Sequence, residues 1–279
     1  MSIRAEFYKL VLLFILFIGV TNLGAQTCGT CTMTFSSGSV NLNLTDGTDV
    51  ICITGTVTIN NANNLGQGGD QICITSTGRL TWTSPAINNG TLHINVQPGG
   101  VYNDANGSWN GKITMNNGGT ANFTNSNGLQ LQNGNVINNL SGGILNANTG
   151  TPAKITINNN GNTINNNGTI NTKVFEVAEG IFTNSTMAIL NVVGEANIHA
   201  DNFSTAGRIN AGSLVFSNKP GDGPEFFPTS CTVISGAINV DAQVIFNGYL
   251  ETSSSVTFSN LGRDNGAAGT LVVRTVVGA

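Results

Sequence analysis

The four residues ICIT occur twice near the start of the chain, and the distance between the two copies limits the folds that the chain can adopt. The copies begin at Ile51 and Ile72, so the repeat is 21 residues long. The same spacing separates GTLHINV, which begins at Gly90, from GKITMNN, which begins at Gly111. A unit this short, with no helical period, cannot bury its own apolar face. We therefore expect successive copies to stack on one another as a solenoid.

Within each unit, apolar and polar residues alternate. Ile51 and Ile53 are followed in later units by pairs such as Ile155 and Ile157, and this period of two is typical of a strand with one face inward. KITMNN reappears as KITINN 42 residues later, which we interpret as two periods. A 21-residue coil, at about 3.3 Å per residue, has room for three short strands and three turns. The predicted fold class is all-β, a right-handed parallel β-helix with coils of about 21 residues.

Asparagine clusters such as INNAN, MNNGG and INNNGN follow the strand-like segments. We expect them at the corners, because Asn and Gly tolerate a positive φ angle at low cost. Stacked coils would place one asparagine over another about 4.8 Å away, so their amides could hydrogen-bond along the axis as a ladder.

The two ends of the chain differ from the middle. The first residues combine Arg4 and Lys9 with an apolar run too short to span a bilayer, the pattern of a cleaved signal peptide. The mature protein is therefore expected to be secreted or at the cell surface and not membrane-spanning. The chain ends in the strand-like LVVRTVVGA, which predicts a C-terminal neighbour or end-to-end contact. The expected segments are 1–25 signal peptide, 26–49 N-terminal cap, 50–216 parallel β-helix, 217–231 Pro/Gly-rich loop and 232–279 further coils.

Charged residues make up only 9% of the chain, and its formal net charge is −4. A surface of this kind has no basic patch with which to bind nucleic acid. The acids are scattered along the sequence, and we assign no catalytic residue, no metal site and no cofactor. The loop pairs Asp46/Asp49 and Asp222/Glu225 are candidates for weak calcium binding, with solvated turn residues as the alternative.

The chain has five cysteines, an odd number for an exported protein. Cys52 and Cys73 alternate with isoleucines, so we expect them to point outward, one above the other. A separation of about 4.8 Å between coils lies within the Cα distance range of a disulfide, which makes this pair the candidate bridge. An unreacted thiol pair is the alternative. Cys28 and Cys31 spell CGTC, but no helix follows, which argues against redox catalysis.

Two aromatic residues are candidates for ligand binding. Tyr102 and Trp109 flank the segment NDANGS, where an exposed ring could stack on a sugar. Packing of the loop is the alternative explanation. Threonine pairs such as Thr56/Thr58 and Thr81/Thr83 also leave an ice-binding face open as a further hypothesis.

The segments ICITGTVTI, NNGTLHI, NNGTIN and GRINAGSL resemble the Asn/Gly-rich repeats of secreted bacterial surface proteins with parallel β-helix regions. They are similar in style to filamentous haemagglutinin-type adhesins and to large exported proteins of the Bacteroidetes. The resemblance implies a non-enzymatic, adhesin-like or surface-structural protein that presents a rigid solenoid to a surface glycan or a cell-surface protein. The alternative is a polysaccharide lyase or hydrolase, or a carbohydrate-binding module, on the same scaffold.

Overall fold

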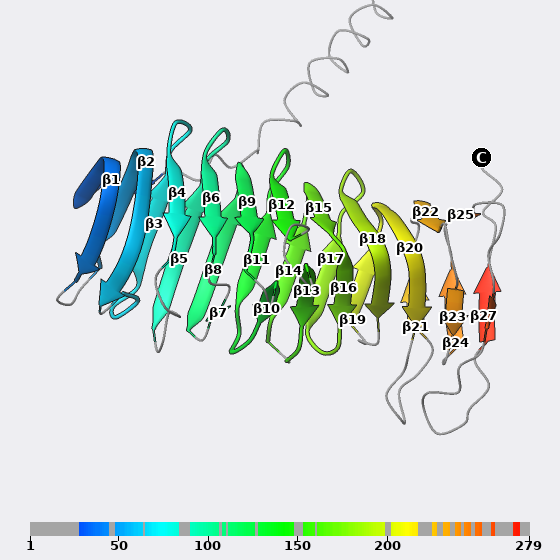
Figure 1. Cartoon of the computed structure of the whole chain (residues 1–279). Helices are drawn as coiled ribbons and strands as arrows, with labels where there is room; N and C mark the ends of the chain where they lie inside the picture. The colour runs from blue at the N-terminus through cyan, green and yellow to red at the C-terminus, as the bar shows by residue number, and fades with distance from the viewer. Residues whose placement is uncertain are drawn as a thin grey trace, which may run out of the picture.

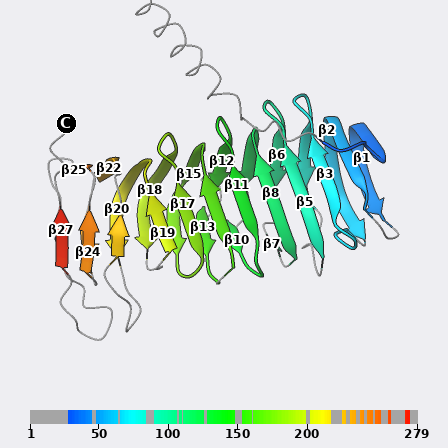
Figure 2. The same cartoon turned by 180° about the vertical axis from the view of Figure 1, so that it is seen from behind.

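The computed structural model describes residues 28–44, 48–63, 65–83, 90–105, 108–109, 111–125, 128–147, 153–159, 161–198 and 202–216, together with short strands between residues 225 and 273. The strands stack into an elongated rod whose first and last strands lie at opposite ends (Figures 1 and 2). All regular elements in the described part of the chain are β-strands. The same part of the chain contains no helix with the length and hydropathy needed to cross a membrane.

Neighbouring strands pair in parallel throughout the rod, which confirms the predicted solenoid. Ile51 lies opposite Ile72 and Cys52 opposite Cys73, so the two ICIT copies are in register. Thr91 lies opposite Lys112, as the repeat of GTLHINV and GKITMNN predicts. The 21-residue spacing is therefore the length of one coil at this end of the rod.

The strands of the rod lie on three faces. The first two strands are long and run through a corner: β1 (Met33–Asn43) and β2 (Val50–Asn63). The first face continues with β3 (Asp70–Ile74), β5 (Thr91–Val96), β8 (Lys112–Asn117), β11 (Val136–Asn139), β14 (Thr163–Asn166), β17 (Ile181–Asn184) and β19 (Asn202–Thr205).

The second face follows in the same order along the rod. It consists of β4 (Arg79–Trp82), β6 (Val101–Asp104), β9 (Thr120–Phe123), β12 (Ile144–Ala147), β15 (Thr169–Thr172), the first halves of β18 (Ile189–Ile198) and β20 (Arg208–Phe216), then β22 (Cys231–Ile234) and β25 (Tyr249–Thr252).

The third face has the shortest strands. It consists of β7 (Ser108–Trp109), β10 (Leu129–Leu131), β13 (Lys154–Ile157), β16 (Val174–Val177), the second halves of β18 and β20, β23 (Ile238–Val240) and β26 (Phe258–Ser259). A separate parallel sheet contains β21 (Glu225–Phe227), β24 (Gln243–Phe246) and β27 (Thr270–Val273).

Coil length varies along the rod although the register is kept. Asparagines that hydrogen-bond across neighbouring coils are 21 residues apart between Asn95 and Asn116, but 27 residues apart between Asn138 and Asn165. The next coil is shorter, with 18 residues between Asn166 and Asn184. The corners between strands absorb these differences.

One of the sequence repeats does not correspond to the stack. Lys112 begins β8 on the first face, whereas Lys154 begins β13 on the third face. β8 pairs with β5 and β11, and β13 pairs with β10 and β16, so KITMNN and KITINN never lie above one another. The interpretation of their 42-residue spacing as two periods is wrong, because strands on different faces share the same alternation of apolar and polar residues.

The core is a set of columns that run along the rod. Every second residue of a strand points inward, and most of these residues are Ile, Leu or Val with no exposed surface. Aromatic rings also belong to the core, and Phe175 and Phe182 meet edge to face with 4.8 Å between their ring centroids. The continuous apolar core explains why a short, weakly charged repeat can fold.

Glycine, rather than asparagine, takes most left-handed corner positions. Ten glycines have a positive φ among the described residues, against two other residues, Asn133 (φ 60°) and Ala153 (φ 46°). The asparagines stand instead in the strands or next to them, where their side chains reach the neighbouring coil. The predicted ladder is therefore present, and among the described asparagines only Asn133 has the positive φ expected at the corners.

The segment predicted as an N-terminal cap contains a coil. Met33–Asn43 is strand β1, which pairs in parallel with β2. The predicted signal peptide lies outside the described residues, as does most of the 217–231 loop. Beyond that loop β22, β23, β25 and β26 continue the parallel pairing.

Candidate functional site

The two aromatic residues expected at the surface lie in the core. Tyr102 in β6 has no exposed surface, and Trp109 in β7 is 3% exposed. Both rings pack edge-on against Phe123, with centroid distances of 6.2 and 5.5 Å. The prediction that they form an exposed platform for a sugar is wrong, because the alternation of β6 turns Val101 and Asn103 outward and Tyr102 inward.

A buried carboxylate explains where these rings point. Asp104 Oδ2 accepts a hydrogen bond from the Tyr102 hydroxyl at 2.9 Å and another from Trp109 Nε1 at 2.8 Å. Burial, reinforced by the adjacent carboxylate, raises the pKa of Tyr102 well above its usual value. Asp104 itself is fully buried. The cluster has no access to solvent, so its chemistry is structural: it ties β6 to β7. Sequence reasoning missed this role, although Asp104 shares the inward face of Tyr102 two residues before it.

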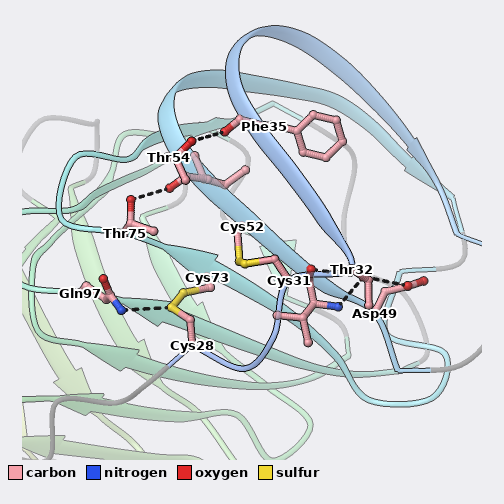
Figure 3. Close-up of a disulfide and its surroundings, with 12 residues drawn as sticks. Cys28, Cys31, Thr32, Phe35, Asp49, Cys52, Thr54, Cys73, Thr75 and Gln97 are labelled. Atoms are coloured by element: carbon pink, nitrogen blue, oxygen red, sulfur yellow. Dashed lines mark hydrogen bonds between the residues drawn. A yellow bond between two sulfur atoms is a disulfide. The ribbon is translucent and has the colours of Figure 1, made fainter.

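The cysteines pair differently from the prediction. Cys52 bonds to Cys31 and Cys73 bonds to Cys28, each with a Cα–Cα distance of 5.7 Å (Figure 3). Cys52 and Cys73 are in register on the outward side of β2 and β3, as expected, but the predicted bridge between them is wrong. They are also buried rather than exposed, because the chain that precedes β1 lies across them.

Residues 28–32 form this crossing segment, which we call the strap. Thr32 fixes its end to β2: its amide donates to the Val50 carbonyl at 2.9 Å, and its Oγ1 accepts from the Val50 amide at 3.0 Å. Thr32 Oγ1 also donates to Asp49 Oδ1 at 3.1 Å. At the other end, Gln97 Nε2 donates to Cys28 Sγ at 3.2 Å. The strap therefore crosses the first face: Cys28 lies at β3 near the end of β5, and Cys31 lies at β2 (Figure 3).

Asparagine ladders run along the outward side of the rod. On the first face, each side-chain amide donates to the asparagine of the preceding coil, at 2.7 to 3.0 Å, through Asn95, Asn116, Asn138 and Asn165. On the second face the same arrangement links Asn103, Asn122, Asn146, Asn171, Asn191 and Asn210 at 2.6 to 2.8 Å. The side-chain amides of stacked coils thus satisfy one another's hydrogen bonds along the axis of the rod.

A third ladder lies inside the rod, at the end of the first-face strands. It links the fully buried or nearly buried Asn117, Asn139, Asn166, Asn184 and Thr205 at 2.7 to 3.2 Å. Its amides donate in the opposite direction, toward the C-terminal end. Each amide also donates to a backbone carbonyl, such as that of Ile144 for Asn117. These second bonds hold the corner that leads to the second face.

Charged residues form no cluster in the described part of the chain. Lys154 and Glu176 make an ion pair between β13 and β16. Asp70 is buried and accepts backbone amides of Asp49 at 3.0 Å and Gly66 at 2.7 Å, which is the role of a turn residue. Within the described ranges no group of three or more His, Cys, Asp or Glu could hold a metal ion.

The candidate calcium pairs fall largely outside the described residues. Asp46 and Asp222 lie there, as does the side chain of Glu225. Asp49, the remaining member, instead accepts the Thr32 hydroxyl. The calcium hypothesis stays a prediction.

The threonine pairs of successive coils do not lie directly over one another. Thr58 lies opposite Thr81, but Thr56 lies opposite Arg79. At the next coil, Asn103 follows Thr81. The described residues of these coils therefore offer no regular threonine array of the kind that an ice-binding face needs.

Comparison of the chain with protein-family models, with curated proteins and with solved structures gives no match.

Proposed function

We propose that the chain is an exported, non-enzymatic, adhesin-like or surface-structural protein whose solenoid serves as a rigid rod. The observation that carries the proposal is the set of three asparagine ladders, which join successive coils by side-chain bonds in addition to the parallel sheets. Buried and half-buried amides that are all bonded along one axis resist bending at the coil boundaries. A stiff rod of this kind is suited to displaying its outward side chains at a distance from the cell that carries it.

The outward side chains support a structural role over a catalytic one. The described outward positions of the first and second faces are mainly Asn and Thr, and the ladder amides already bond to one another. Glycosidases act through a pair of closely placed carboxylates, and lyases add calcium or a basic residue. Glu176, the outward acid of β16, is instead neutralised by Lys154.

Two observations support export. The first residues have the pattern of a signal peptide. Two disulfides close the N-terminal end of the rod, and disulfides persist in oxidising compartments outside the cytosol. The proposed partner is a surface glycan or a cell-surface protein.

Two experiments test the proposal. Protease treatment of intact producing cells, followed by an antibody against the chain, is expected to show accessible protein at the surface. Recovery of the chain only inside the cytosol would overturn the proposal of export.

The purified chain is then applied to a glycan array and, in parallel, to soluble polysaccharides with a reducing-sugar assay. No sugar release is expected; release would replace the proposal with a polysaccharide-degrading enzyme.

A further inference from the structure

The first coil is the least supported part of the described rod. β1 pairs with β2 along one edge, and no described strand pairs with its other edge. Its apolar residues Met33, Phe35 and Val40 pack against the core but remain partly exposed. Equivalent residues one coil later, such as Ile51 and Ile53, have no exposed surface. A strand with half of the usual packing is the first to open, because local stability follows the number of buried contacts.

The two disulfides act on this strand. The Cys31–Cys52 bond joins residues 21 positions apart, and the ring that it closes contains the whole of β1. The Cys28–Cys73 bond joins residues 45 positions apart and fastens the strap to β3. While both bonds are present, β1 can open only within this closed ring, because Cys31 stays bonded to β2 and the chain after β1 leads into β2.

We propose that the strap is an oxidation-dependent lock on the N-terminal end of the rod. With both disulfides formed, β1 stays on β2 and the strap covers Cys52 and Cys73. With both reduced, the contacts that remain are the backbone pairing of β1, the Thr32 bonds to Val50 and the partly exposed apolar contacts. The first coil then detaches, while the coils linked by the asparagine ladders keep their structure.

The exposure of the four cysteines sets the order of reduction. Cys31 is exposed and Cys28 is partly exposed, whereas Cys52 and Cys73 are buried. A thiolate of dithiothreitol therefore attacks Cys31 Sγ first, forming a mixed disulfide there and releasing Cys52 as a thiol after protonation. The second thiol of dithiothreitol then attacks the dithiothreitol sulfur that is bonded to Cys31. This closes the reagent's ring and releases Cys31 as a thiol. The protein disulfide gains two electrons and two protons, and the reagent becomes a cyclic disulfide. The lock forms by the reverse exchange with a disulfide-bearing oxidant.

Hydrogen–deuterium exchange with mass spectrometry tests the lock on the full chain. The oxidised protein is compared with the same protein in dithiothreitol, with complete reduction verified by alkylation and intact mass. Peptides that cover β1 are expected to exchange at least about tenfold faster after reduction, whereas peptides from β11 and β14 keep their rates. Cys231→Ser, which removes the fifth cysteine, serves as the control background and is expected to give the same pattern.

Variants separate the two bonds. Cys31→Ser with Cys52→Ser removes the ring around β1, and Cys28→Ser with Cys73→Ser leaves it; the first pair is expected to speed β1 exchange more. Reduction of the unmodified chain covers the case in which a variant does not fold. Unchanged exchange of β1 after full reduction would overturn the lock. Faster exchange along the whole rod would also overturn it, as would a non-reducing peptide map that joins Cys52 to Cys73.

Discussion

Val96 and Asn117 are register partners in β5 and β8, and between them an interior column changes from aliphatic side chains to amides. Ile53 and Ile74 precede Val96 in this column, and Asn139 follows Asn117. Asn117 Oδ1 has no hydrogen-bond partner, since Val96 offers no donor. A buried amide atom without a hydrogen bond costs free energy, so each later member of the column depends on its neighbours for its bonds.

Replacement of one ladder member is expected to be costly inside the rod and cheap outside it. Asn139 is fully buried, accepts from Asn117 at 2.8 Å and donates to Asn166 at 2.7 Å. Asn139→Ala is expected to lower the free energy of unfolding by about 2 to 3 kcal/mol, because it leaves buried polar groups unpaired and opens a cavity. Asn138→Ala, in the same strand but on the outward ladder, is the control and is expected to lose less than about 1 kcal/mol. Urea unfolding measures both; equal losses would contradict the assignment.

Stability is expected to fall at high pH through Tyr102. Its pKa is raised by burial and by Asp104, so the unfolded chain gives up this proton at a lower pH than the folded chain does. The contribution is therefore fully present below the unfolded value of about 10 and is lost as the pH rises from there toward the folded pKa. The Tyr102→Phe variant is expected to lose less stability between pH 8 and pH 11 than the unmodified protein. The midpoints of urea unfolding of both proteins at pH 8, 10 and 11 measure this difference. An equal decline in the two proteins would contradict the prediction.

Tryptophan fluorescence should report a dry environment. The chain has two tryptophans, Trp82 and Trp109, which are 2% and 3% exposed. Emission is expected to be blue-shifted and poorly quenched by acrylamide in the native state, and fully quenchable in urea. Addition of a soluble glycan should leave the native spectrum unchanged. Strong quenching in the native state would show that at least one ring reaches solvent.

Two glycines with the same backbone conformation should respond differently to an added methyl group. Gly128 (φ +70°) and Gly142 (φ +79°) are both left-handed. A Cβ at Gly142 meets nothing within 4 Å, whereas one at Gly128 would overlap the Lys154 carbonyl oxygen. Gly142→Ala is expected to cost about 1 kcal/mol, and Gly128→Ala clearly more, because the β10–β13 pairing must shift. Thermal unfolding of the two variants compares them directly; similar melting temperatures would count against the overlap.

The stacking of the coils could be predicted because register is local information. The two ICIT copies are identical and 21 residues apart, so Ile51 is expected over Ile72, and the apolar alternation fixes which side chains face inward. The face on which a strand lies is not encoded in the same way. Lys112 and Lys154 begin nearly identical segments on different faces, because coil lengths vary and all three faces use one alternation.

The contacts outside the repeat could not be predicted from its spacing. Cys28 and Cys31 precede the first coil, and only the course of the strap brings them to Cys73 and Cys52. The burial of Tyr102 is a different case, since the alternation of VYND predicts its inward face and that of Asp104. The polar segment NDANGS favours a loop with exposed rings on either side, whereas the alternation in the strand places the ring of Tyr102 in the core.

The opposite directions of the ladders have a consequence for the length of such a rod. The outward amides on the first and second faces donate toward the N-terminal end, and the interior amides donate toward the C-terminal end. Their dipoles therefore oppose one another along the axis and partly cancel. Each further coil of this design would therefore add a smaller net dipole along the axis than it would if all three ladders ran in the same direction.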